Sequence, residues 1–169
     1  ITFNRIFKMK LARIGNPGKE KPIIIDKDNN YRDISSVIKD FNSDNLNFET
    51  IGKLKNIKIE DLPILDKNQR IGACVNNPSK FIGIGLNFKD HAIEQNMPIP
   101  KEPIIFSKFT NSVSGPNDDI VIPKNSNHTD WEVELGFVIG KKCSYVSEKD
   151  AINYVLGFFL VNDVSERNF

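Results

Sequence analysis

Residues 130–136 read Asp-Trp-Glu-Val-Glu-Leu-Gly. Side chains alternate between the two faces of a strand, so in a strand Glu132 and Glu134 share one face and their apolar neighbours take the other. Two carboxylates about 7 Å apart repel each other when both are ionised and buried. A hard divalent cation relieves that repulsion and prefers oxygen ligands. The stretch therefore predicts a long strand over residues 131–139 whose acidic face either binds a metal or lies solvated opposite lysines.

A third carboxylate, Asp163, follows the apolar run of residues 157–161, which predicts another strand. A carboxylate in this place either caps the strand and starts a turn or faces a site beyond the strand end. Three carboxylates on neighbouring strands would leave positions on a Mg²⁺ or Mn²⁺ ion open for water or substrate. Nothing in the spacing itself makes the two strands neighbours, so both interpretations of Asp163 stand.

Upstream, residues 80–88 read Lys-Phe-Ile-Gly-Ile-Gly-Leu-Asn-Phe, and their length and β-branched content predict a buried strand. A short helix is expected over residues 89–95, and Pro98 prevents its continuation. On that helix Glu94 lies beside His91, three residues earlier, and a carboxylate next to an imidazole orients the ring as a general base requires. An ordinary surface ion pair is the alternative interpretation.

Residues 9–75 are expected to form a small N-terminal α+β domain, and residues 1–8, which precede the first methionine, are expected to be an upstream extension. Short strands separated by turn residues are expected at residues 10–14, 22–26 and 31–34. Apolar residues at helical spacing predict a helix over residues 33–41. In the second half of the chain, further strands are expected at residues 103–109 and 119–123, and a helix at residues 147–154.

The composition excludes several classes of protein. The 169 residues include 23 basic and 22 acidic side chains, so the formal net charge is +1 and a dedicated nucleic-acid binder is excluded. No apolar run approaches the roughly 20 residues of a membrane-spanning helix, so a membrane is not an expected partner. Nucleic acid is not an expected partner either, because of the near-neutral charge. The two cysteines, Cys74 and Cys143, form neither a disulfide framework nor a CxxC zinc motif. A cytoplasmic location is therefore expected.

Five segments of the second half together resemble the fumarylacetoacetate hydrolase family. They are Ile-Gly-Leu-Asn-Phe-Lys-Asp-His at 84–91, Pro-Ile-Ile-Phe-Ser-Lys at 103–108, Ser-Gly-Pro-Asn-Asp at 114–118, the Asp-Trp-Glu-Val-Glu-Leu-Gly stretch at 130–136, and Asn-Asp-Val-Ser-Glu-Arg at 162–167. The resemblance spans roughly residues 80–169. The opening from Met9 to Pro22 also resembles the small N-terminal domain of bacterial members, which are described as ureidoglycolate lyase-like or as 2,4-diketo acid hydrolases.

The resemblance implies a β-rich α+β fold: a mixed β-roll of the fumarylacetoacetate hydrolase type, incomplete here, preceded by the small α+β domain. Residues 76–169 would be the N-terminal part of this metal-binding catalytic domain. The family pattern makes Glu132, Glu134 and Asp163 the metal ligands, and the implied ion is Mg²⁺ or Mn²⁺, with Ca²⁺ as an alternative. A homodimer is expected on the same ground.

The same resemblance gives His91 the role of catalytic base, Glu94 that of its partner, and Arg167 a contact with the substrate. The expected activity is metal-dependent hydrolysis of a C–C bond in a small-molecule 2-oxo or 2,4-dioxo acid in a catabolic pathway. Two alternatives are a ureidoglycolate lyase or oxo-acid decarboxylase or isomerase that uses the same metal site, and a non-catalytic binding or scaffold remnant. An enzyme is favoured over a scaffold because all five core positions of the family pattern are present, namely His91, Glu94, Glu132, Glu134 and Asp163.

The family pattern also includes a glutamine and a lysine that would lie beyond Phe169. We therefore expect the 169 residues to be a fragment of a longer reading frame, and we expect the isolated fragment to be inactive and poorly soluble, because the roll would lack strands.

Overall fold

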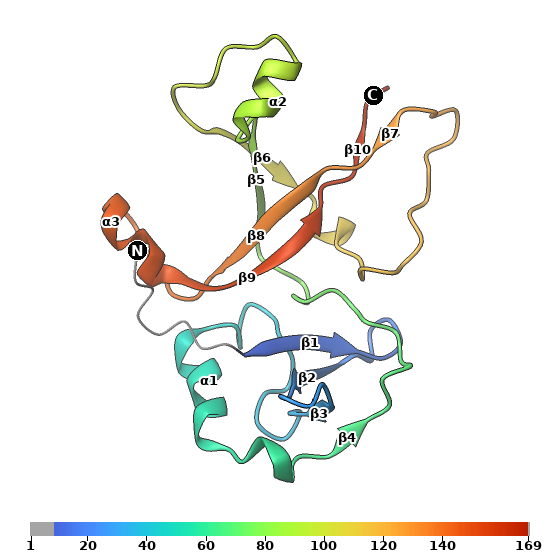
Figure 1. The fold of residues 1–169 in the computed structure, drawn as a ribbon, viewed down its shortest axis with the longest axis vertical. Coiled ribbons are helices and arrows are strands. Elements are labelled where there is room, and N and C mark those ends of the chain that lie inside the picture. The colour runs from blue at the N-terminus through green and yellow to red at the C-terminus, as the bar shows by residue number, and fades with distance from the viewer. Residues whose placement is uncertain (1–8, 169) are drawn as a thin grey trace. The chain divides into compact units, whose positions relative to one another are not determined.

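A computed structural model of the chain describes residues 9–168 (Figure 1). The expected upstream extension, residues 1–8, lies outside the described residues. The chain divides into two compact units: residues 77–113 form the smaller one, and the residues before and after them form the larger one. The domain boundaries expected from the sequence, 9–75 and 76–169, stay a prediction.

A four-stranded antiparallel sheet in the order β1-β2-β3-β4 opens the larger unit (Figure 1). Its strands are β1 (Lys10–Ile14), β2 (Lys21–Ile25), β3 (Tyr31–Asp33) and β4 (Ile64–Leu65). The turn between β1 and β2 places Gly15 and Gly18 at φ values of 126° and 74°, which favour glycine because it has no Cβ. The three strands and the turn predicted for this region are confirmed.

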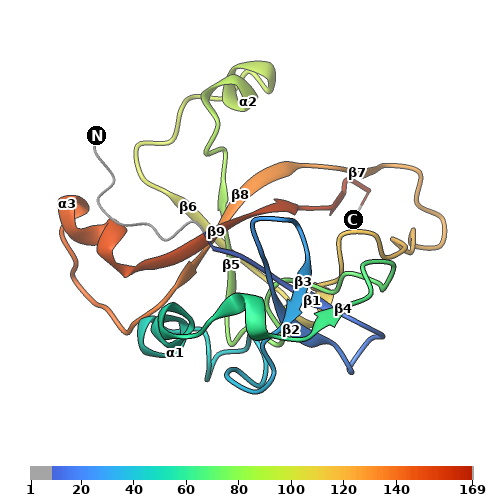
Figure 2. The ribbon, with the colours of Figure 1, turned by 60° about the horizontal axis from the view of Figure 1, so that its bottom comes forward.

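The core of this sheet is built from apolar side chains that come from both strands and loops. Helix α1 (Phe48–Lys53) continues into the 3₁₀ turn η1 (Leu54–Asn56), and its first turn is capped by the Asn47 side chain, which accepts a hydrogen bond from Thr50 N at 2.8 Å. Figure 2 shows α1 beside the sheet. The buried core side chains are Ile24, Ile34, Ile38, Phe41 and Leu54.

After β3 ends at Asp33, residues 34–41 form only turns and bends, so the helix predicted over residues 33–41 is wrong. The Asp33 carboxylate accepts a hydrogen bond from Ser35 N at 2.8 Å, and the Ile34 carbonyl accepts hydrogen bonds from the amides of Val37 and Ile38. These local bonds complete one turn and do not propagate, because side-chain acceptors compete with the helical pattern. The apolar spacing still buries Ile34 and Ile38, but it does so from a loop.

The second part of the larger unit is an antiparallel ribbon of β8 (Val133–Ile139) and β9 (Val155–Asn162), in which Leu135 faces Leu160 (Figure 2). A shorter antiparallel pair is formed by β7 (Thr129–Asp130), which lies just before β8 in the chain, and β10 (Ser165–Glu166), which lies just after β9. The connection between β8 and β9 holds α3 (Glu148–Ala151) and η4 (Ile152–Tyr154). Strands β8 and β9 and the helix between them were predicted, whereas β7 and β10 were not. The strand predicted at 119–123 is wrong because that segment has no regular structure.

The smaller unit consists of an antiparallel pair, β5 (Phe81–Gly85) with β6 (Ile104–Lys108), and helix α2 (Lys89–Glu94) between them. The remaining 3₁₀ turns are η2 (Ile59–Asp61) in the larger unit and η3 (Thr110–Ser112) here. The strands and the helix were predicted, but β5 is not buried, because Ile82 is 55% exposed.

The chain thus has the predicted β-rich α+β character, while closure of the strands into a roll stays a prediction. Within residues 9–168 no helix combines the length and the apolar character needed to cross a membrane.

Candidate active site

The β8–β9 ribbon brings the three predicted metal ligands to one face. Asp163 N donates a hydrogen bond to the Glu132 carbonyl at 2.7 Å, so these residues lie directly opposite each other, one step beyond the Val133–Asn162 pair. Directly opposed residues of an antiparallel pair share a face, and so do residues two apart in one strand. Glu132, Glu134 and Asp163 therefore share the half-buried face of the ribbon, opposite the exposed face that carries Val133.

Arg167 contacts the acidic end of this ribbon. The β7–β10 pairing directs the arginine to the start of β8, where Nη2 contacts Glu132 Oε1 and lies 3.0 Å from Asp130 Oδ2. Hydrogen bonds to Glu132 and then to Asp130 raise the pKa of Arg167 above its ordinary value, so its charge is fixed. The predicted substrate-binding residue is therefore bonded, in this structure, to two carboxylates, one of which is a predicted metal ligand.

The donor set suits a hard divalent cation. It offers carboxylate oxygens from two paired strands, and the Oδ1 atom of Asp163 is buried, as an inward-facing ligand atom would be. Among residues 9–168, however, no three His, Cys, Asp or Glu side chains are gathered closely enough to hold a metal ion. The structure thus aligns the three carboxylates on one face but does not converge them, and their role as ligands stays a prediction.

The predicted base and its partner belong to the smaller unit. Helix α2 presents His91 and Glu94 on one side, with His91 Nδ1 3.8 Å from Glu94 Oε2. That distance allows an ion pair but is too long for a hydrogen bond. His91 is 39% exposed and Glu94 is 76% exposed, so both can reach a ligand. The predicted pairing within the helix is present, and the catalytic roles stay predictions.

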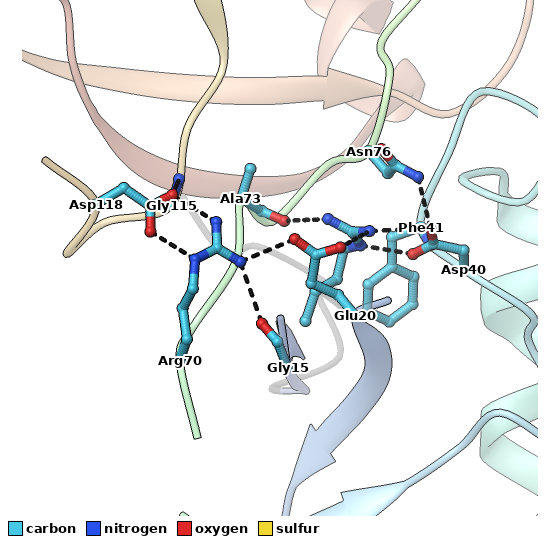
Figure 3. A network of polar contacts seen from close by, with 10 residues as sticks. Gly15, Glu20, Asp40, Phe41, Arg70, Ala73, Asn76, Gly115 and Asp118 are labelled. Carbon is cyan, nitrogen blue, oxygen red and sulfur yellow. Dashed lines mark hydrogen bonds and ion pairs between the residues drawn. The ribbon is translucent and has the colours of Figure 1, made fainter. Parts of the chain in front are cut away.

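The structure also contains a polar network that the sequence analysis missed (Figure 3). Arg13 lies 2.6 Å from Asp40 and 3.3 Å from one oxygen of Glu20, and Arg70 lies 2.9 Å from the other oxygen of Glu20 and 2.5 Å from Asp118. These five side chains alternate in charge from one end of the network to the other. Arg70 is 48 residues from Asp118 and 50 from Glu20, so no local spacing could reveal the network.

The three acids of the network are held in their charged form. Burial alone would raise the pKa values of Glu20 and Asp40, but hydrogen bonds and the nearby arginines outweigh it, and both pKa values lie below their ordinary values. A hydrogen bond from Arg70, and then one from the Gly115 amide, lowers the pKa of Asp118. The three carboxylates of the network are therefore ionised at neutral pH.

Comparisons with known proteins agree on the relationship of this chain. It is 52% identical over 161 residues to a protein of Burkholderia multivorans and equally similar to one of Burkholderia lata, both of which carry names that assign them provisionally to the hydrolases. The matched region is 95% of this chain but only 57% of each relative, so the chain spans a little over half the length of these relatives.

Solved structures show the same fold. One is 2-hydroxyhepta-2,4-diene-1,7-dioate isomerase from Mycobacterium marinum, with a TM-score of 0.62, 26% identity, and coverage of 95% of this chain and 56% of that one. Another is maleylpyruvate hydrolase from Sphingobium sp. SYK-6 in complex with manganese(II) and pyruvate, with a TM-score of 0.74, 22% identity, and coverage of 95% and 60%.

The family assignment follows from the second half of the chain. The model of the fumarylacetoacetate hydrolase C-terminal domain matches residues 80–169, which is more than half of the sequence and includes every residue singled out above for the catalytic and metal-binding roles. The chain belongs to the fumarylacetoacetate hydrolase family.

Proposed function

We propose that this protein is a hydrolase that uses a divalent metal ion to cleave a carbon–carbon bond of a 2-oxo or 2,4-dioxo acid. The observation that carries the proposal is the pairing of Glu132 with Asp163 across the β8–β9 ribbon, on the face that also carries Glu134. Family membership and the hydrolase names of the relatives support it. Because the chain spans 57% of those relatives, the activity of the whole protein is itself part of the proposal.

In this proposal the three carboxylates of the ribbon would hold Mg²⁺ or Mn²⁺. The chemistry that a divalent cation supplies in such a site is Lewis-acid stabilisation of the negative charge that develops on a bound 2-oxo acid. The Glu132, Glu134 and Asp163 side chains offer only carboxyl oxygens, which favour a hard cation over any anion in this place. A substrate carboxylate would then be bound by the cation and by a positive side chain, for which Arg167 is the nearest candidate.

His91 would move the protons of the reaction. Glu94 faces its Nδ1 atom, so Nε2 is left to accept a proton from water. The hydroxide adds to the carbonyl carbon at position 4 of a 2,4-dioxo acid, the bond between carbons 3 and 4 breaks, and its electron pair passes to carbon 3. A proton returned to carbon 3 completes a 2-oxo acid, and the other fragment leaves as a carboxylic acid.

The metal site is tested by thermal unfolding of the full-length protein with and without Mn²⁺ or Mg²⁺. A ligand that binds the native state alone raises its stability by mass action, so we expect an increase in Tm of about 5 °C at saturating metal. Glu134→Gln should abolish the increase. Glu148→Gln, which changes an exposed glutamate on α3, should leave it unchanged. No metal-dependent shift in the wild-type protein would contradict the metal site and favour the scaffold alternative.

The reaction is tested with a panel of oxo acids in the presence of metal. Hydrolysis yields two smaller acids, and His91→Gln should lower kcat by about 10²- to 10⁴-fold. The similar solved structure from Mycobacterium marinum is 26% identical to this chain and is named an isomerase. It favours a second candidate function, the isomerisation of an unsaturated dicarboxylic acid at the same site. Mass spectrometry separates the two candidates, because isomerisation leaves the mass of the substrate unchanged. Hydrolysis of no acid on the panel would contradict the first candidate.

A further inference from the structure

The small unit that carries His91 is joined to the larger unit at two points of the chain. The chain enters it after Asn76 and leaves it at Ser114. Both flanking segments, Asn76 on one side and Gly115 to Asp118 on the other, belong to the larger unit. Both are also held by the polar network of Figure 3, which lies entirely within the larger unit.

The entry end is fixed through Asp40. Asn76 donates from its side chain to Asp40 Oδ2 at 2.7 Å, and its backbone amide donates to the Phe41 carbonyl, also at 2.7 Å. Both oxygens of the same carboxylate accept hydrogen bonds from Arg13, at 2.6 and 3.0 Å. Paired hydrogen bonds between a guanidinium and a carboxylate fix orientation as well as distance. Asn76, the last residue before the small unit, is therefore hydrogen-bonded to Asp40, and Arg13 fixes the position of that carboxylate.

The exit end is fixed through Asp118. Gly115 donates from its backbone amide to Asp118 Oδ2 at 2.6 Å, and Arg70 binds both oxygens of that carboxylate at 2.5 Å. Gly115 is buried, and a Cβ atom on it would lie 2.4 Å from the Ile71 carbonyl oxygen. The first residues after the small unit are therefore held both by charge and by close packing.

Glu20 joins the two ends. One of its oxygens accepts from Arg13 and the other from Arg70, and its side chain is only 7% exposed. A movement of either arginine must therefore change the surroundings of the same buried carboxylate. Removal of one partner from a buried ion pair is costly because it leaves the other charge uncompensated.

We propose that Asp40, Arg13, Glu20, Arg70 and Asp118 form a two-point anchor that couples the two ends of the His91-bearing unit, so that loosening the centre loosens both ends. Arg13, Glu20 and Arg70 are positioning residues for that unit and touch no reacting atom. The consequence for catalysis rests on the function proposed above for His91, whereas the coupling of the two ends does not.

Two backbone amides report the two ends. The Asn76 amide donates to the carbonyl of Phe41, the residue next to Asp40 of the anchor, and the Gly115 amide donates to Asp118 of the anchor itself. The experiment is residue-resolved hydrogen exchange on the full-length protein, with an amide of core residue Ile24 as the measure of global opening. Glu20→Gln removes the central charge without touching either reporting residue. We expect both amides to exchange about tenfold faster relative to Ile24, a factor that corresponds to the loss of one charged hydrogen bond.

The matched control is Asp26→Asn. Asp26 is also a 7% exposed carboxylate of the N-terminal sheet and is paired with Arg32, but it contacts neither end of the small unit. Neither amide should change relative to Ile24 in this variant. Acceleration at only one amide, or at neither, in Glu20→Gln overturns the anchor. If Glu20→Gln does not fold, Arg70→Lys keeps the charge but loses the paired geometry, and the same joint acceleration is required of it.

Kinetics separate this inference from the proposed function. If the anchor positions His91, Glu20→Gln should lower kcat about threefold to tenfold and leave KM within about twofold. An unchanged kcat overturns the positioning role, even where exchange supports the coupling. If the wild-type protein turns over no oxo acid, the proposed function fails, and the exchange of the two amides still decides the anchor.

Discussion

The carboxylates of this chain differ in what neutralises them. Glu20 and Asp26 in the N-terminal sheet are each 7% exposed and paired with arginines that are themselves largely buried. Glu132 on the ribbon is paired with Arg167, which is 44% exposed. A buried pair is costly to break, whereas a partly exposed pair exchanges with water and other ions at little cost. We therefore expect fixed charges in the sheet and exchangeable charges on the ribbon.

Asp26 should control stability in acid. A hydrogen bond from Arg32, with others from Asn30 and the Asp28 amide, lowers the pKa of Asp26 from 3.8 to about 2. A lowered pKa stabilises the fold above the unfolded value, so this contribution is complete above pH 4 and is lost as the pH falls towards 2. Asp26→Asn should lower Tm at neutral pH and flatten the fall of Tm between pH 4 and 2. Asp28→Asn, an exposed neighbour, serves as the control, and an equal flattening in both variants would contradict the prediction.

Arg167 should compete with metal for Glu132. Its Nη2 atom contacts Glu132 Oε1, so a cation bound there must share the carboxylate or displace the guanidinium. Arg167→Gln should therefore tighten Mn²⁺ binding by about threefold to tenfold, a modest effect because the pair is partly exposed to water. Isothermal titration of the full-length protein measures it, with Lys142→Gln as a control for net charge. Weaker binding in Arg167→Gln than in the control would show that the arginine supports the metal site.

At the scale of elements, apolar patterns and turn residues predicted the strands and turns that depend only on neighbouring residues in the sequence. The β1–β2 hairpin follows from two apolar strands and the glycines of its turn. Residues 119–123 have the same β-branched character but remain irregular, because a strand also needs a partner and this segment has none among the described residues. Residues 33–41 show the opposite case, since their apolar residues are buried as expected although no helix forms.

The candidate site divides in the same way. Alternation within one strand was enough to place Glu132 and Glu134 on the same face. The pairing of Glu132 with Asp163 depends on the register of β8 and β9. The connection through α3 does not fix that register, so it could not be predicted from the sequence. The network around Glu20 joins residues about 50 positions apart, and no periodicity carries that information. The carboxylate face was thus predictable in part from local sequence, while the anchor was not.

Two glycines that lie opposite phenylalanines should be important for the stability of the β5–β6 and β8–β9 strand pairs. Gly136 faces Phe159 and Gly83 faces Phe106, and a Cβ atom on either glycine would lie 2.4 or 2.3 Å from the aromatic ring. Gly136→Ala or Gly83→Ala should therefore destabilise the fold by about 1–3 kcal/mol, the usual cost of overpacking. Chemical denaturation measures the change in the free energy of unfolding.

The same strands provide matched controls. A Cβ atom on Gly157 would meet nothing within 4 Å, and one on Gly85 would make only ordinary contact with Ile104. Gly157→Ala and Gly85→Ala should be neutral or stabilising, because alanine reduces the conformational freedom of the unfolded chain. Equal losses at Gly136 and Gly157 would mean that backbone flexibility, and not the aromatic ring, decides the cost.

At the scale of the whole molecule, burial is distributed unevenly. Of the hydrophobic side chains that are fully buried in the described part of the chain, all but Ala92 lie between Ile14 and Leu54. The β8–β9 ribbon, by contrast, exposes one continuous apolar face, made of Val133, Leu135, Phe137, Ile139, Phe158 and Leu160. The N-terminal sheet therefore has its own core, while the ribbon presents an apolar face without a cover among residues 9–168. Exposed apolar faces of this extent mark surfaces that associate.

The 169-residue chain should therefore self-associate through this ribbon face. Leu160 is 80% exposed and lies opposite Leu135, which is 60% exposed, so a charge at either position would interrupt the face at its centre. We expect light scattering to detect oligomers of the 169-residue chain at micromolar concentration, and Leu160→Lys to reduce them. Val121→Lys is the control, because Val121 is 88% exposed but lies in an irregular segment that is not part of the ribbon strands. An equal reduction by both variants would trace the effect to net charge, and a monodisperse wild-type chain would show that the apolar face does not drive association.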